Sequence, residues 1–198
     1  MTLLALVRHG PTEWSAARRL QGRSDVPLSP AGREEVARWR LPPELVGWQW
    51  LTSPLQRAGE TAELLGLAQA RREPRLIEMG WGAWEGLTLA ELDRIPEAAL
   101  AERAAAGLDF QPPGGESPRQ VQARLIPLLA DIAQAGRPTG GVTHKGVIRA
   151  VFALASGWNM LGKPPARLDW QSAHLFRLGA DGGPAVERLN LSLHGEAG

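Results

Sequence analysis

The chain opens with a short apolar run that ends in a charged pair, Leu3-Leu4-Ala5-Leu6-Val7-Arg8-His9-Gly10. Consecutive apolar residues are typical of a strand that is buried on both faces, because a strand with one solvated face alternates apolar and polar side chains. The abrupt change at Arg8 predicts that the strand ends there. We therefore expect a buried first strand whose end presents Arg8 and His9.

Helical and extended patterns alternate along the rest of the chain. Ser29 followed by Pro30 predicts a helix start, with Ser as the N-cap and Pro in the first helical position. Ser53 with Gln56 three residues later has the capping-box pattern, which predicts another helix start. Helices are expected over about 30–41, 54–65, 87–107 (broken at Pro96), 118–134 and 147–155, and further strands over 46–51, 75–79, 140–143, 173–178 and 186–191.

This alternation predicts an α/β fold with a doubly wound, mostly parallel sheet flanked by helices on both faces. The last two strands surround the turn Asp181-Gly182-Gly183-Pro184 and could add an antiparallel edge. No internal repeat or linker divides the sequence. We therefore expect a single domain over 1–198, with residues 80–117 forming a small helical flap over one end of the sheet.

Composition excludes several classes of function. The 198 residues include no cysteine, which excludes a disulfide framework, an iron–sulfur cluster and a cysteine nucleophile. They include no tyrosine, which excludes any mechanism that needs a phenol. A net charge of +1 argues against a nucleic-acid partner. No stretch reaches the ~20 apolar residues of a membrane span, so we expect a cytoplasmic protein with no membrane partner.

Polar groups from four separate segments should meet at one rim of the sheet. Arg8 and His9 follow the first strand, Arg57 lies in the first turn of a helix, Glu78 ends the third strand and His144 follows a later one. Ligands of open α/β sheets bind at the carboxyl ends of the strands.

The residue types at this rim point to phosphate chemistry. Guanidinium groups and a helix N-terminus suit phosphate oxygens. An imidazole among these cations should stay neutral and nucleophilic, and a carboxyl group of raised pKa could protonate a leaving alkoxide. The set predicts phosphoryl transfer through a phosphohistidine.

The same residues lie in five blocks that resemble the histidine phosphatase (phosphoglycerate mutase-like) superfamily. The blocks occur in order over about residues 3–150, and together they are far more specific than an isolated Arg-His-Gly. They are Leu6-Val7-Arg8-His9-Gly10-Pro11-Thr12-Glu13-Trp14, Thr52-Ser53-Pro54-Leu55-Gln56-Arg57-Ala58, Glu78-Met79-Gly80-Trp81-Gly82-Ala83-Trp84-Glu85-Gly86, Gly114-Gly115-Glu116-Ser117 and Thr143-His144-Lys145-Gly146-Val147-Ile148-Arg149.

The resemblance implies a role for each matching residue. His9 would be the phosphorylated nucleophile, and Glu78 the proton donor and later the base for water. Arg8, Arg57 and His144 would clamp the phosphate. A further group would lie at the phosphate or substrate edge: Thr12, Ser15, Gln21, Gly22, Lys145 and Gly146. Two of these depart from the family pattern, which commonly has Asn at Ser15 and Gly at Lys145. Lys145 could add charge at the pocket mouth or turn outward.

The expected function is a metal-independent phosphomonoesterase without a cofactor, acting as a monomer or homodimer. Its substrate would be a small phosphorylated metabolite, with α-ribazole 5′-phosphate and broad specificity both open. A phosphoglycerate mutase that uses 2,3-bisphosphoglycerate is the alternative within the family. The short chain and the Ala-rich segment 87–107 favour the phosphatase. Two other classes remain: a metal hydrolase using His9, His144 and Glu78, and a non-catalytic phospholigand-binding protein.

Overall fold

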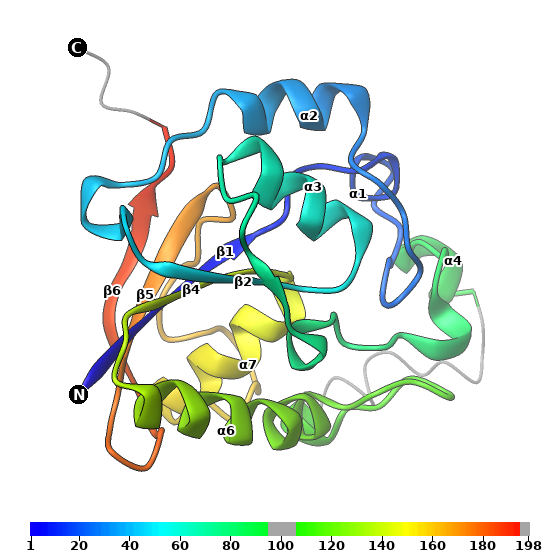
Figure 1. The fold of residues 1–198 in the computed structure, drawn as a ribbon. Coiled ribbons are helices and arrows are strands. Elements are labelled where there is room, and N and C mark those ends of the chain that lie inside the picture. The colour runs from blue at the N-terminus through cyan, green and yellow to red at the C-terminus, as the bar shows by residue number, and fades with distance from the viewer. Residues whose placement is uncertain (95–105, 195–198) are drawn as a thin grey trace.

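The protein is a three-layer α/β structure with a six-stranded sheet in the middle (Figure 1). The computed structural model describes residues 1–94 and 106–194. The strand order is β3-β2-β4-β1-β5-β6. The strands are β1 (Thr2–Arg8), β2 (Gln49–Thr52), β3 (Arg71–Arg72), β4 (Thr139–Thr143), β5 (Ser172–Leu178) and β6 (Pro184–Ser192).

The sheet is mixed, with a parallel part and an antiparallel edge, as the sequence predicts. β1 pairs in parallel with β4, β4 with β2, and β2 with β3. β5 runs antiparallel to β1, and β6 antiparallel to β5. Because β1 and β4 are parallel neighbours, Arg8 lies opposite Thr143, and the residues that follow both strands emerge at one rim.

Helices cover both faces of the sheet (Figure 1). One face packs α2 and α3 around Val36, Trp39 and Ala58, and the other packs α6 and α7 around Leu125 and Phe152. The α-helices are α1 (Glu13–Ala16), α2 (Pro30–Ala37), α3 (Gln56–Leu64), α4 (Leu89–Leu92), α6 (Pro118–Ala135) and α7 (Lys145–Ser156). Short 3-10 turns are η1 (Pro43–Leu45), η2 (Pro74–Leu76), η3 (Gly82–Trp84) and η5 (Gly107–Asp109).

Several helix ends have local causes, including the predicted cap at Ser29. The Ser29 hydroxyl accepts from the backbone N–H of Gly32 at 3.0 Å, and Pro30 is the first helical residue of α2. Ser117 and Gln120 form a capping box at the start of α6. α7 ends at Gly157, whose φ of 69° is in the left-handed region that glycine adopts without strain. Local side-chain chemistry therefore sets these boundaries.

Two local predictions were wrong. Residues 75–79 are not a strand: Pro74 has no N–H, the Glu73 side chain accepts from the Arg75 N–H at 3.1 Å, and a 3-10 turn forms. The third strand is β3, a few residues earlier. Ser53 does not cap α3, because Leu55 is the N-cap residue and the first helical N–H, that of Gln56, donates to Asp25 Oδ1 at 2.7 Å.

Two further predictions concern the helix over residues 87–107 and the absence of a membrane-spanning segment. Of the helix expected over 87–107, the structure describes α4, and residues 95–105 lie outside the described residues. Among the residues that are described, no helix is long and apolar enough to cross a membrane.

Candidate active site

Two histidines meet at the rim formed by the ends of β1 and β4. His9 follows β1 and His144 follows β4, and the backbone N–H of His9 donates to the Thr143 carbonyl at 2.9 Å. The two imidazole centroids are 5.1 Å apart. Both side chains are buried, at 4% exposure for His9 and 0% for His144. The parallel register of the two strands therefore places the two rings side by side.

The hydrogen bond at His9 assigns its tautomer. Nδ1 lies 2.7 Å from the Gly10 carbonyl oxygen. A carbonyl can only accept, so Nδ1 carries the proton and Nε2 keeps a free lone pair. Burial, followed by the charges of Arg8 and Arg57, lowers the pKa of His9 well below its ordinary value of 6.5. The ring is therefore neutral at pH 7, with Nε2 available as a nucleophile.

His144 is a second buried, neutral imidazole. Its Nε2 lies 2.6 Å from the Ser53 hydroxyl, and its buried Nδ1 has no hydrogen-bond partner within the described structure. Burial, then the neighbouring His9 and Arg57, lower the pKa of His144 well below 6.5. Ser53 thus positions this ring, and its hydroxyl also accepts from the Leu55 N–H at 3.3 Å, just before α3. This role of Ser53 could not be predicted from the sequence, because Ser53 and His144 are 91 residues apart.

Arg57 is a fully buried cation in the first turn of α3. Its terminal nitrogens donate to the carbonyls of Gly22 (2.7 Å) and Ser24 (2.8 Å). Its Nε and that of Arg8 are buried without a partner, and neither Arg forms an ion pair with a carboxylate within the described residues. A cation near a helix N-terminus opposes the helix dipole. An anion bound between Arg8 and Arg57 would offset this unfavourable interaction between the cation and the helix dipole.

Glu78 faces the same site as a buried carboxyl group, 8% exposed. It accepts from the backbone N–H of Met79 (2.8 Å) and of Gly146 (3.1 Å). Burial raises the pKa of Glu78, against the opposing effects of these hydrogen bonds and of Arg57 and Arg8. A carboxyl group with this pKa can carry a proton nearer to neutral pH than an exposed glutamate can.

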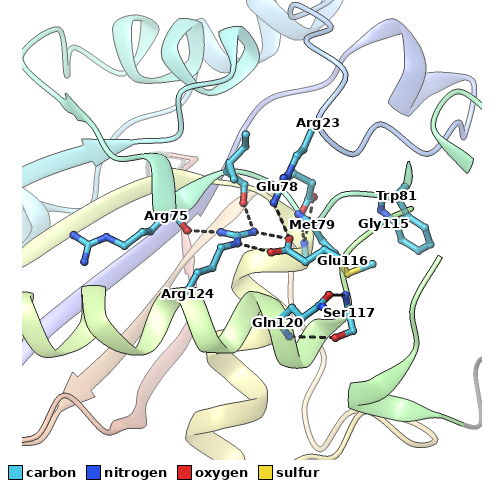
Figure 2. Close-up of polar contacts among 12 residues, drawn as sticks. Arg23, Arg75, Glu78, Met79, Trp81, Gly115, Glu116, Ser117, Gln120 and Arg124 are labelled. Carbon is cyan, nitrogen blue, oxygen red and sulfur yellow. Dashed lines mark hydrogen bonds and ion pairs between the residues drawn. The ribbon is translucent and has the colours of Figure 1, made fainter. Parts of the chain in front are cut away.

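Arg124 fixes the segment that carries Glu78 (Figure 2). From α6 it donates to the backbone carbonyls of Arg75 and of Ile77, the latter at 2.7 Å. Its guanidinium also pairs with both carboxylate oxygens of Glu116, at 2.9 and 3.1 Å, and Glu116 pairs with Arg23 at 3.3 Å. This network holds the segment before Glu78 in place without the ladder hydrogen bonds of a strand.

Of the predicted residues of the phosphate edge, Gly22 contacts Arg57, whereas Thr12, Ser15 and Gln21 are bonded to one another. Thr12 and Ser15 form the capping box of α1, and the Thr12 hydroxyl donates to Gln21 Oε1 at 3.0 Å. Ser15 Oγ accepts from the Thr12 N–H at 2.8 Å. Gly22 contributes its carbonyl to Arg57. Thr61, not predicted as a site residue, accepts from the Gly10 N–H at 3.0 Å and so ties α3 to the loop after His9.

Lys145 and Gly146 lie at the start of α7. Gly146 donates to Glu78, whereas the Lys145 side chain is exposed and its Nζ lies 5.2 Å from the Trp170 ring centroid. Trp170 lines an open cleft that also includes His9, the predicted nucleophile. The cleft is lined by Arg8, His9, Pro11, Ser15, Ala16, Glu35, Trp39, Asp169, Trp170 and Gln171.

The family model of the histidine phosphatase superfamily (branch 1) matches residues 4–192. The chain belongs to this superfamily. It is 36% identical over 183 residues to the glucosyl-3-phosphoglycerate phosphatase of Mycolicibacterium vanbaalenii, covering 80% of this chain and 78% of that protein. It is 34% identical over 161 residues to phosphoglycerate mutase-like protein 4 of Arabidopsis thaliana, covering 77% and 70%.

Solved structures agree with this assignment. TTHB049 from Thermus thermophilus superposes with a TM-score of 0.73 at 31% identity, covering 96% of this chain and 99% of that one. A mycobacterial glucosyl-3-phosphoglycerate phosphatase in complex with VO3 superposes with a TM-score of 0.76 at 28% identity, covering 98% and 99%. The chain is therefore an enzyme of the histidine phosphatase superfamily, with the α/β fold that its sequence predicts.

Proposed function

We propose that the enzyme hydrolyses phosphate monoesters through a phosphohistidine formed on His9. One observation carries the proposal: the Nδ1–H bond to the Gly10 carbonyl leaves Nε2 free, beside two guanidinium groups that lack carboxylate partners. In the first step Nε2 attacks phosphorus, the bond from phosphorus to the ester oxygen breaks, and Glu78 gives its proton to the departing alkoxide. In the second step Glu78 takes a proton from water, whose oxygen attacks phosphorus and releases His9 and inorganic phosphate.

Arg8, Arg57 and His144 would bind the phosphoryl oxygens. Their charges and N–H groups compensate the negative charge that spreads over these oxygens in the transition state, which is the main means of catalysing phosphoryl transfer. Thr12, Ser15, Gln21, Gly22, Lys145 and Gly146 complete the proposed phosphate and substrate edge. The chemistry proposed for these residues needs no metal.

The proposed substrate is a small phosphorylated metabolite. One of the curated relatives named above is a glucosyl-3-phosphoglycerate phosphatase, and a further solved structure of a mycobacterial enzyme with this activity is its complex with inorganic phosphate. Glucosyl-3-phosphoglycerate is therefore the first compound for a substrate panel, alongside α-ribazole 5′-phosphate, sugar phosphates and nucleotides. Comparison of kcat/KM across the panel identifies the preferred leaving group. Isomerisation of 3-phosphoglycerate faster than phosphate release would identify a mutase instead.

Trapping of the phosphoenzyme tests the mechanism. Rapid quenching with a ³²P-labelled ester should give an acid-labile, alkali-stable label at His9. His9→Ala should abolish the label and turnover, whereas His194→Ala, which changes an exposed histidine, should keep both. Turnover should continue in the presence of a metal chelator. Full loss of activity on chelation with recovery on adding zinc would contradict the proposal, and so would turnover without any labelled histidine.

We also propose that residues 1–198 act as one catalytic domain in the cytoplasm, as a monomer or homodimer and without nucleic acid. Limited proteolysis, cell fractionation and light scattering of the purified protein test these statements. Two independently stable fragments, a membrane-bound pool or a larger assembly would contradict them.

A further inference from the structure

A partly buried cation lies against the segment that carries the proposed proton donor (Figure 2). Arg124 donates from α6 to the carbonyl of Arg75 and, at 2.7 Å, to that of Ile77, which belongs to the peptide bond leading into Glu78. A cation in this place has two effects. Its hydrogen bonds fix the backbone before Glu78, and its charge favours the ionised form of a nearby carboxyl group. The second effect opposes an acid that must keep its proton.

Glu116 compensates this charge. Its two oxygens accept from the guanidinium of Arg124 at 2.9 and 3.1 Å, and its side chain is only 13% exposed. A bidentate pair of this kind is both strong and geometrically specific. Arg23 reaches the same carboxylate at 3.3 Å, but its side chain is 49% exposed, so this outer pair contributes less. In the part of the chain that the structure describes, Glu116 is the only carboxylate paired with Arg124.

The backbone brings Glu116 to this position. Its N–H donates to the Gly80 carbonyl at 2.8 Å, so the residue just before α6 is bonded to the stretch that follows Glu78. A Cβ at Gly115 would lie 2.6 Å from the same Gly80 oxygen, closer than real atoms approach. Glycine at position 115 therefore permits the close approach that places the Glu116 carboxylate over Arg124.

Other cations already act on Glu78. Burial raises the pKa of Glu78, and the charges of Arg57, from α3, and of Arg8, from the end of β1, act against this shift. Lys145, at the start of α7, also faces the carboxyl group: burial lowers the pKa of Lys145, and the charge of Glu78 acts to raise it. The two imidazoles of the rim are neutral. A fourth, uncompensated cation on Arg124 would favour the ionised form further.

We propose that Glu116 is a positioning residue of the active site: by neutralising Arg124, it lets the guanidinium hold the backbone before Glu78 without favouring loss of the proton from that carboxyl group. This inference rests on the phosphatase function proposed above, in which Glu78 is the proton donor. It assigns separate parts to the two members of the pair. Arg124 supplies the hydrogen bonds, and Glu116 removes the net charge.

Removal of one member of the pair at a time should give shifts of opposite sign. The measurement is the pH above which kcat/KM for an alkyl phosphate falls as Glu78 loses its proton. Glu116→Gln leaves the cation uncompensated, so this pH should decrease by about 1 pH unit. Arg124→Met leaves the carboxylate uncompensated, so it should increase by about as much. The double variant should return it close to the wild-type value.

The rate below that pH tests the positioning separately. Arg124→Met should lower kcat/KM for the alkyl phosphate by about 10²-fold, the cost of a misplacement near 1 Å. The loss should be much smaller for p-nitrophenyl phosphate, whose leaving group needs no proton. Glu116→Gln keeps an oxygen acceptor and the shape of the side chain, so its loss below that pH should be much smaller than that of Arg124→Met.

Asp109→Asn is the matched control. It breaks an ion pair with Arg119, which lies on α6 like Arg124, but both side chains of this pair are exposed. The control should keep the wild-type pH dependence and rate. Ionisation of the substrate's phosphate group is common to all variants, so a difference between variants reports the enzyme.

Two outcomes would overturn the proposal. They are an unchanged pH dependence in both single variants, and shifts of the same sign in both, since a purely structural pair has no reason to move the pH dependence in opposite directions. Failure of the phosphatase function is a separate result, because the wild-type enzyme would then hydrolyse neither ester. In that case NMR titration of ¹³C-labelled glutamate carboxyl groups follows Glu78 without turnover, and the same opposite shifts are expected.

Discussion

At the scale of single residues, Glu78 combines burial with a position beside two cations. Burial raises its pKa from 4.5, so the protonated form that can donate to a leaving group persists to higher pH. Because Glu78 also serves as the base for water in the second step, the acid role is tested by kcat/KM, which reports only phosphoenzyme formation. Glu78→Gln should lower kcat/KM by about 10²–10⁴-fold for an alkyl phosphate. The loss should be much smaller for p-nitrophenyl phosphate, whose leaving group needs no proton. In the wild type, kcat/KM for the alkyl ester should fall as pH rises through the raised pKa, and the variant should lack this limb. Equal losses of kcat/KM for both esters would contradict the acid role.

The carboxyl group of Glu78 lies so close to Gly146 that this position has no room for a side chain. A Cβ at this position would lie 2.4 Å from Glu78 Oε1, closer than real atoms approach. Gly146→Ala should displace the carboxyl group, and a displacement near 1 Å can cost about 10²-fold in rate. Gly59→Ala is the matched control, because Gly59 lies in α3 with no atom within 4 Å of the added Cβ. The control should keep full activity. Wild-type kcat for Gly146→Ala would show that Glu78 does not act from the position observed.

At the scale of elements, the loop from Gly22 to Ser24 connects Glu85 with Arg57. Glu85 accepts from the backbone N–H groups of Arg23 (2.9 Å), Ser24 (2.9 Å) and Trp81 (3.1 Å). Burial acts to raise the pKa of Glu85, but these bonds and the Ser24 hydroxyl leave it below its ordinary value, so the group stays ionised. Through this loop, Glu85 places the two carbonyls that orient Arg57.

Glu85→Gln tests this connection. An amide can accept on only one side, so one of the two sets of N–H donors loses its acceptor and the loop shifts. We expect the inhibition constant for inorganic phosphate to rise by about 10-fold, since one well-placed charge-assisted contact is worth that much. Glu63→Gln, in the exposed part of α3, is the control. A lower melting temperature with an unchanged inhibition constant would show that Glu85 stabilises the fold without positioning Arg57.

Elements with a clear local signal could be predicted from the sequence, whereas contacts between residues far apart in the chain could not. The apolar run before Arg8 and the capping residue Ser29 act on their immediate neighbours, so the sequence pattern was sufficient to predict the first strand and the start of α2. Ser53 matched a capping pattern but lies against His144, 91 residues away. The segment before Glu78 resembled a strand, but Pro74 and the reach of Arg124 from α6 give it another conformation. The five blocks identified the family because they combine residues that meet only in the folded rim.

At the scale of the whole molecule, binding of an anion at the rim should stabilise the fold, because the cations Arg8 and Arg57 have no carboxylate ion pair within the described residues. An anion that binds the native rim and not the unfolded chain stabilises the protein by an amount that grows with ligand concentration. Inorganic phosphate at about 100 times its dissociation constant should add about 2.7 kcal/mol to the free energy of unfolding. Arg57→Met should remove most of this gain, and Arg38→Met, at an exposed position, should keep it. Equal stabilisation of both variants would show that phosphate acts elsewhere.

The buried histidines should also make the fold sensitive to acid. Burial lowers the pKa of His174 in β5 from 6.5 to about 4, so the unfolded chain takes up a proton at this side chain before the native protein does. Stability is therefore lost as pH falls below 6.5. Between about pH 7.5 and pH 5.0 this one group should cost about 2 kcal/mol, to which the lowered pKa values of His9 and His144 add.

The pH dependence of His174→Gln isolates this contribution. The raised pKa of Glu78 acts in the opposite direction, since its native carboxyl binds the proton more tightly, but it is common to both proteins. Urea unfolding at the two pH values should show a loss of free energy about 2 kcal/mol smaller in the variant than in the wild type, whatever the variant's stability at the higher pH. His194→Gln, at an exposed position, should keep the wild-type loss. If His174→Gln loses as much as the wild type, the protonation of His174 does not drive acid unfolding, and His9 and His144 at the rim are left as the groups to test.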